Sequence, residues 1–273
     1  MRRAKWNTPI VYILLIGYSA VTVTPFLWAF FSSFKPLSEI VGGFSFFPNE
    51  WTLDNYRYIV ETQPLFLRWL LNSVVIAVSA TVLNLLFNSM AGYALARLSF
   101  PGKKATFLIV LAVLMIPMQV TMIPNFLILR ELGWLNSYQG MIVPAMVNAT
   151  FIFMMRQFFV NFPKEIEEAA AVDGLSRFGT FFRIVLPMAK PALFAQAIFV
   201  FMAIWNDFMR PLIVMTEPSM MTLPVGLNAF QSDNVSFWNY VMSASMIFTL
   251  PVLILYIFFS RLFIDGLSFR GDK

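Results

Sequence analysis

The chain has 273 residues, of which 59% are hydrophobic and only 12% are charged, and its mean hydropathy is +0.73. An ordinary soluble domain carries about 25% charged residues, so this composition excludes that class and indicates an integral membrane protein. The absence of Cys and His excludes disulfides, thiol catalysis, histidine proton relays and the usual zinc ligands. The net charge of +5 is better explained by its distribution between the membrane spans than by a nucleic-acid partner.

Six apolar stretches are long enough to cross a bilayer as helices, which takes about 20 residues. The first follows a basic N-terminus, but it is too long for a signal peptide and lacks a small-residue cleavage pattern. We therefore expect an all-α integral membrane protein, with residues 1–273 forming a single domain of six transmembrane helices. The predicted spans lie near residues 10–32, 70–95, 106–128, 139–160, 192–214 and 241–263.

The basic residues predict the orientation of the spans. With the N-terminus inside, 14 of the 19 Lys and Arg residues fall in cytoplasmic segments, and five fall outside: Lys35, Arg57, Arg68, Arg130 and Arg210. Cytoplasmic loops carry the excess of basic residues in membrane proteins, so both termini and the loop at residues 161–191 should be cytoplasmic.

The loop at residues 161–191 is polar and charged, although it lies between two apolar spans. Pro163 can open a helix at its first position, three glutamates favour the positive N-terminal end of that helix, and alanines favour its continuation. We expect Gly174 to end the helix. A second amphipathic helix then carries Phe178, Phe181, Phe182 and Val185 among two arginines until Pro187 stops it.

Polar residues within the spans suggest a bundle with a polar interior, because unsatisfied polar groups in hydrocarbon are costly. Helix packing is the alternative for each asparagine, and an ion pair with Arg210 at a helix end is the alternative for Asp207. The candidate residues for a solute path are Asn72, Asn88, Asn148, Trp205, Asn206 and Asp207.

The predicted outer segment from Glu217 to Trp238 is rich in turn-forming and hydrogen-bonding residues. It is either a plain loop or a surface that contacts a solute or a solute-carrying protein. The candidate contact residues are Asn228, Gln231 and Asp233.

The cytoplasmic loop carries an extended motif: Glu-Ala-Ala, three residues, Gly, nine residues, Ile, one residue and Leu-Pro. This motif resembles the EAA loop of bacterial ABC-importer permeases, and the chain as a whole is similar to a type I importer permease. The resemblance implies a pair of short cytoplasmic helices that dock into the ATP-hydrolysing subunit. The alternative is an amphipathic linker held against the membrane surface by Phe and Arg. The implied coupling residues are Glu168, Ala169, Ala170, Asp173, Gly174, Ile184, Leu186 and Pro187.

Further segments resemble permeases of carbohydrate importers, specifically those related to the smaller maltose-transporter permease. The resemblance implies four kinds of partner in a bacterial or archaeal cytoplasmic (inner) membrane: a second permease, an ATPase dimer, an extracytoplasmic solute-binding protein and membrane lipid. The solute would be a sugar or oligosaccharide, or alternatively glycerol phosphate. The similar segments are residues 33–36, 72–73, 91–97, 100–103, 205–208, 222–227 and 263–267.

The chain itself lacks the Gly-x-x-x-x-Gly-Lys-Ser/Thr pattern of a phosphate-binding loop. We therefore expect no cofactor in this chain, with ATP and Mg²⁺ bound by the partner ATPase. A secondary transporter is the alternative from another class, but it would be expected to carry ionisable residues deep in its spans. A membrane enzyme is a further alternative, and no paired carboxylates or metal cluster in the sequence support it.

Overall fold

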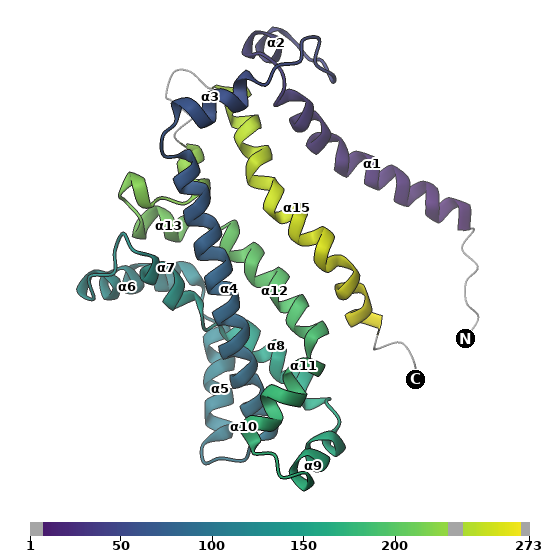
Figure 1. The fold of residues 1–273 in the computed structure, drawn as a ribbon, viewed down its shortest axis with the longest axis vertical. Coiled ribbons are helices and arrows are strands. Elements are labelled where there is room, and N and C mark those ends of the chain that lie inside the picture. The colour runs from purple at the N-terminus through teal and green to yellow at the C-terminus, as the bar shows by residue number, and fades with distance from the viewer. Residues whose placement is uncertain (1–7, 229–236, 269–273) are drawn as a thin grey trace. The chain divides into compact units, whose positions relative to one another are not determined.

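The computed structural model describes residues 8–228 and 237–268, and these residues form helices and connecting loops without a β-strand (Figure 1). The chain packs as two compact units. Unit 1 comprises Met1–Leu67 and Gly226–Leu250, and unit 2 comprises Arg68–Val225 and Pro251–Lys273.

Unit 1 contains α1 (Thr8–Ser32), α2 (Leu37–Gly42), α3 (Asp54–Thr62) and the first part of α15 (Trp238–Ser268). Asn55 on α3 is buried and links three segments of this unit. Its amide donates hydrogen bonds to the carbonyls of Ser33 (2.9 Å) and Lys35 (2.8 Å), and its side-chain oxygen accepts one from Asn239 (2.7 Å). One amide thus joins α3 to the first residues after α1 and to the start of α15.

The segment after α1 is organised around a buried lysine. The ammonium of Lys35 donates to the carbonyl of Ser45 (2.6 Å), and the Ser45 hydroxyl donates to Glu39 (2.9 Å). Burial alone would raise the pKa of Glu39, but hydrogen bonds from the Asn49 N–H and the Ser45 hydroxyl outweigh it, so this pKa is lowered. Glu39 therefore stays ionised at neutral pH and holds the segment together.

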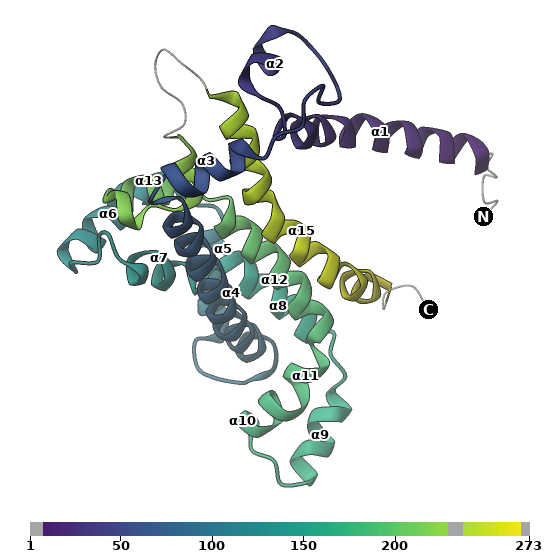
Figure 2. The same cartoon turned by 45° about the horizontal axis from the view of Figure 1, so that its top comes forward.

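Unit 2 contains the remaining helices. Figures 1 and 2 both show α9 and α10 at one end of this unit, and α6, α7 and α13 toward the other. The helices are α4 (Phe66–Arg97, from Arg68 on), α5 (Lys103–Leu114), α6 (Met118–Glu131), α7 (Tyr138–Ala145), α8 (Ala149–Val160), α9 (Lys164–Val172), α10 (Arg177–Thr180), α11 (Leu186–Met188), α12 (Lys190–Trp205), α13 (Met209–Val214) and α14 (Leu223–Leu227), with a π-helical turn at Phe181–Val185 and a 3₁₀ turn at Pro218–Met220.

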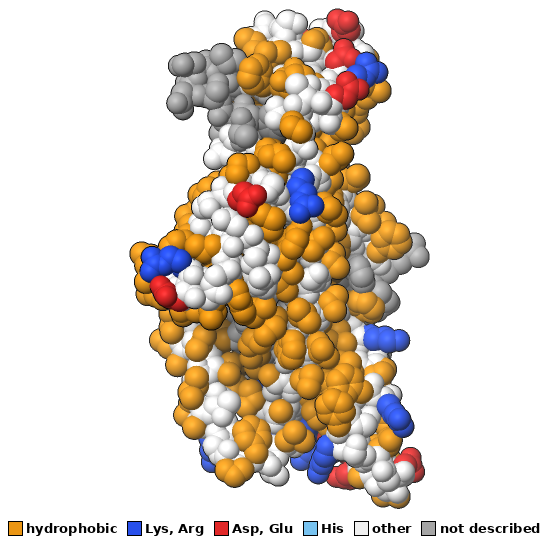
Figure 3. Space-filling view, turned by 60° about the vertical axis from the view of Figure 1, so that its left-hand side comes forward, with side chains coloured by type: hydrophobic (Ala, Val, Ile, Leu, Met, Phe, Trp, Pro, Cys, Tyr) orange, Lys and Arg blue, Asp and Glu red, His pale blue; other side chains and the backbone are white. Residues whose placement is uncertain are grey.

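Four stretches of the described chain are helical, long and apolar enough to cross a membrane: Pro9–Ser32, Phe66–Arg97, Tyr138–Val160 and Trp238–Phe258. They correspond to the predicted first, second, fourth and sixth spans within a few residues. Two bent helix pairs bring the number to six if each pair is one span. Hydrophobic side chains cover most of the face drawn in Figure 3, and charges of both signs gather at its upper and lower ends.

The predicted third and fifth spans are not single straight helices. Residues 106–128 divide into α5 and α6, which meet at an angle of 104°. The break falls at Pro117, which lacks an N–H and disfavours a helical residue before it. Residues 192–214 divide at Asn206–Phe208 into α12 and α13, and α12 itself lies at 77° to the segment Arg177–Met188.

Asparagines on α4 hold the break between α7 and α8. Asn84 donates to the carbonyl of Ala145 (2.9 Å), and Asn88 donates to that of Met146 (3.4 Å) and accepts from the N–H of Asn148 (3.0 Å). Gln196 on α12 donates to the side chain of Asn84 (3.0 Å). We call Asn84, Asn88, Asn148 and Gln196 the amide network. It pairs backbone groups that would otherwise be unsatisfied at membrane depth.

Candidate functional site

Helix α9 begins and ends close to where its residues predict. It starts one residue after Pro163, which precedes the helix instead of occupying its first position as predicted. It ends in a Schellman motif, in which the Gly174 N–H bonds to the Ala171 carbonyl (3.1 Å) and the Leu175 N–H to the Ala170 carbonyl (3.0 Å). Gly174 has φ +80°, a conformation that a residue without Cβ adopts freely. The prediction that Gly174 ends the helix is confirmed.

The second half of the loop at residues 161–191 packs against the rest of unit 2. Ser176 caps α10 by accepting a hydrogen bond from the Gly179 N–H (3.1 Å). The π-helical turn then places Phe181 and Val185 in a buried cluster with Tyr93 on α4 and with Phe159 and Met155 on α8. This packing fixes the loop on two membrane helices.

The predicted coupling residues divide by exposure. Ala170 is buried, and Ile184 and Leu186 are half-buried. The exposed ones are Glu168, Ala169, Asp173, Gly174 and Pro187. Two apolar side chains of the same loop are also exposed to an unusual degree, Val172 at 88% and Phe178 at 64%. We call Glu168, Ala169, Val172, Asp173, Gly174 and Phe178 the loop face.

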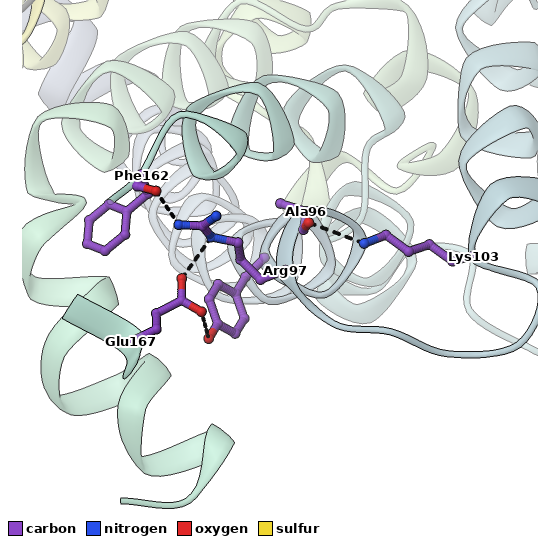
Figure 4. Close-up of polar contacts among 6 residues, drawn as sticks. Ala96, Arg97, Lys103, Phe162 and Glu167 are labelled. Carbon is purple, nitrogen blue, oxygen red and sulfur yellow. Dashed lines mark hydrogen bonds and ion pairs between the residues drawn. The ribbon is translucent and has the colours of Figure 1, made fainter. Parts of the chain in front are cut away.

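A buried ion pair beside the loop face was not predicted from the sequence. The Arg97 Nε lies 2.8 Å from Glu167 Oε1, with the two side chains only 6% and 10% exposed (Figure 4). The Arg97 guanidinium also donates to the carbonyl of Phe162, and the Tyr93 hydroxyl donates to Glu167 Oε2 (3.3 Å). We call Arg97, Glu167, Tyr93 and the Phe162 carbonyl the buried clamp.

Unit 2 also contains a cavity of about 390 Å³. We call it the transport cavity, after the role proposed for it under Proposed function. Its lining combines amides, one ion pair, aromatic rings and apolar side chains. Of the six predicted path residues, Asn148 and Asp207 line it. The lining residues that the prediction missed include Asn84, Asn125, Phe126, Phe151 and Arg210.

Asp207 and Arg210 pair as the alternative interpretation of Asp207 expected. The Arg210 Nε lies 3.1 Å from Asp207 Oδ2, and the Arg210 N–H donates to Asp207 Oδ1 (3.3 Å). The pair connects the break after α12 to the first turn of α13. It therefore orders the start of α13, and both of its residues also line the cavity.

The other four predicted path residues do not line the transport cavity. Asn72 bonds to the carbonyls of Ser219 and Met221, and Asn88 belongs to the amide network. Trp205 is buried and stacked on Phe201, and Asn206 donates to the Met202 carbonyl. Packing and backbone pairing therefore account for these side chains.

Among the three predicted contacts for a binding protein, Asn228 is exposed just after α14. Gln231 and Asp233 lie outside the described residues.

The comparisons with known proteins bear on these sites. Residues 88–269 match the model of the family described as binding-protein-dependent transport system inner membrane component. The chain belongs to this family. The matched residues of this permease include the loop at residues 161–191 and every lining residue of the transport cavity except Asn84.

Curated relatives of this permease extend over its whole length. The arabinooligosaccharides transport system permease protein AraQ of Halalkalibacterium halodurans is 39% identical over 99% of both chains. The trehalose/maltose transport system permease protein MalG of Thermococcus litoralis is 33% identical over 94% of each. A solved bacterial ABC transporter involved in the import of the polysaccharide alginate superposes with a TM-score of 0.85, covering 96% of this permease and 98% of that chain. That likeness, at 23% identity, shows the fold.

This permease is therefore a transmembrane subunit of a sugar ABC importer, located in the inner membrane, and it is not an enzyme. Family membership assigns it to the ATP-driven importers. It thereby excludes the two alternatives left open by the sequence, a secondary transporter and a membrane enzyme.

Proposed function

We propose that this permease imports an oligosaccharide and is coupled to a separate ATPase through the loop face. The observation that carries the proposal is that the motif residues Glu168, Asp173 and Gly174 are exposed, while the loop that bears them is fixed on α4 and α8. A docking surface has to be accessible, and it has to be attached rigidly to what it moves.

The partners follow from the family. An importer permease of this class implies a second permease, an ATPase dimer that binds ATP and Mg²⁺, and an extracytoplasmic binding protein. Asn228, Gln231 and Asp233 are the proposed contacts for that binding protein. The loop face carries both an acidic group and apolar side chains, which suits a cleft with a basic residue and an apolar floor.

Charge reversal at Glu168 tests the docking surface. We expect Glu168→Lys to reduce the amount of ATPase that co-purifies with the permease several-fold, because a lysine would meet the basic residue that the glutamate is proposed to pair with. The matched control is Glu165→Lys, which makes the same charge change at an exposed position of the same helix outside the motif. Equal recovery of ATPase with both variants would contradict a role for Glu168 in docking.

We further propose that the solute passes through the transport cavity. The amides of Asn125 and Asn148, which are exposed, can donate to and accept from sugar hydroxyls, and the rings of Phe126 and Phe151 offer faces on which a sugar can pack. A phosphate would require a free cation. Among the described residues that line the cavity, Arg210 is the one Lys or Arg, and it is already paired with Asp207. This favours a neutral saccharide over glycerol phosphate.

Asn125 provides a test of the cavity, because it lines the cavity from the exposed surface of α6. We expect Asn125→Ala to lower the uptake rate about threefold to tenfold, since one hydrogen bond contributes about 0.5–1.5 kcal/mol. Recovery of the ATPase should not change. Gln157→Ala, at an exposed position outside the cavity, is the control. Wild-type uptake by the Asn125 variant would argue against the cavity as the path.

The proposed function as a whole is tested by purifying the tagged chain from its native membrane in mild detergent and identifying the subunits that accompany it. We expect a second permease and an ATPase, and uptake of labelled oligosaccharides by vesicles that contain the complex and its binding protein. A preparation that holds no ATPase after gentle crosslinking would overturn the coupling proposal.

A further inference from the structure

The buried clamp joins three segments that the sequence separates widely. Arg97 is the last residue of α4, Phe162 lies between α8 and α9, and Glu167 lies within α9. The clamp therefore connects the loop face to a membrane helix that is not its neighbour in the chain. Besides the clamp and its connections to α8 and α10, α9 is held by Ile166, which packs against the buried cluster of Tyr93 on α4 and Phe159 on α8.

Adjacent glutamates of α9 point in different directions. Glu167 is buried against Arg97, whereas Glu168 is exposed on the loop face. This follows from helix geometry, which turns successive residues by about 100°. One face of α9 is thus available to a partner, while the opposite face holds α4.

The end of α4 that carries Arg97 is itself fixed. The Lys103 ammonium donates to the carbonyl of Ala96 (3.2 Å; Figure 4) and to that of Leu98 (2.8 Å), the two residues that flank Arg97. These carbonyls belong to the terminal turn of α4, where intrahelical partners are missing. A displacement of Glu167 is therefore passed to the helix backbone and is not absorbed by a frayed helix end.

We propose that the buried clamp is a transmission element, in which Arg97 and Glu167 are positioning residues that impose the movement of α9 on α4. This inference rests on the proposed coupling function of α9. The helix that receives the movement carries Asn84, a residue of both the amide network and the transport cavity, about 20 Å from Arg97 along the helix axis. The clamp thus links the loop face to the solute path through a single rigid helix.

Two variants separate transmission from stability. Glu167→Gln leaves Arg97 buried without its counter-charge, which is destabilising. The double variant Arg97→Met/Glu167→Leu removes both charges and keeps apolar packing, an exchange that proteins often tolerate without loss of stability. It lacks the directional bonds to Glu167 and Phe162. Glu131→Gln makes the same chemical change at an exposed ion pair with Arg130 and is the control.

The first measurement is the ratio of solute taken up to ATP hydrolysed, in vesicles that contain the complete complex. We expect this ratio to fall about tenfold in both clamp variants, while ATPase recovery and the control stay at the wild-type level. If the clamp serves only the stability of the fold, the stable double variant should recover the wild-type ratio of solute taken up to ATP hydrolysed. That recovery would overturn the proposal and leave the importer function standing.

The second measurement uses the full chain alone and does not depend on the ATPase. Because the chain has no Cys, spin labels can be placed at Phe87→Cys on α4 and Glu165→Cys on α9, both exposed. We expect one narrow distance distribution in the wild-type background and a broad one in both clamp variants. Unchanged distributions would overturn the clamp. The proposed function fails on a different result, namely the absence of ATPase from the complex purified with the wild-type chain.

Discussion

Gly174→Asp is expected to abolish solute uptake while leaving the amount of permease in the membrane unchanged. A Cβ at this position would meet nothing within 4 Å, so a steric clash is not the reason. The φ of +80° costs a residue with a side chain about 1–2 kcal/mol, and the Schellman motif depends on it. The new carboxylate would also lie beside Asp173 at the negative end of α9. Both effects act on the loop face and not on the spans.

The matched variant for this prediction is Gly174→Asn. Asparagine has nearly the same shape as aspartate, and both visit the left-handed conformation more readily than other residues with a side chain, so the two variants differ in charge. We expect Gly174→Asn to retain most of the uptake and ATPase recovery. Uptake assays on vesicles with equal amounts of each permease variant make the comparison. Wild-type uptake in Gly174→Asp would contradict the role assigned to the end of α9.

Gly92→Leu is expected to have the second large effect, the loss of folded permease. A Cβ at Gly92 would lie 2.7 Å from Met155 Cβ and 2.8 Å from the Arg156 backbone nitrogen, so α4 and α8 can approach this closely only at a glycine. Overpacking of this kind typically costs about 1–3 kcal/mol, and a leucine adds three more carbons beyond the Cβ. The displacement would also disturb the amide network, which joins the same two helices.

The control is Gly17→Leu on α1, where a Cβ would meet nothing within 4 Å. The membrane level of each variant and the thermal stability of the purified chain in detergent measure the difference. We expect Gly17→Leu to match the wild type on both measures. A Gly92→Leu chain as abundant and as stable as the wild type would show that the α4–α8 contact is wider than described.

Local signals in the sequence were enough for features that depend on neighbouring residues. The end of α9 at Gly174 follows from the conformational freedom of glycine, and the pair between Asp207 and Arg210 follows from their three-residue spacing. The positions of the long apolar helices follow from where apolar residues are concentrated along the chain. The predicted orientation in the membrane stays a prediction.

Features that depend on distant residues could not be predicted in this way. The three glutamates at the start of α9 look alike in the sequence, and only the position of Arg97, 70 residues earlier, selects Glu167 as the buried one. Pro117 signals a break, but packing decides that its angle is 104°. Likewise, Asn72 pairs with backbone carbonyls while Asn148 lines a cavity, because the same side chain meets different surroundings.

The amide network has a consequence for how this chain is made. The break between α7 and α8 leaves the carbonyls of Ala145 and Met146 in need of donors, and the donors, Asn84 and Asn88, are synthesised about 60 residues earlier. Bare carbonyls are costly in lipid. When this interrupted span leaves the ribosome, the helix that satisfies it has already been translated. The direction of protein synthesis therefore delivers Asn84 and Asn88 to the bilayer ahead of the two carbonyls to which they donate.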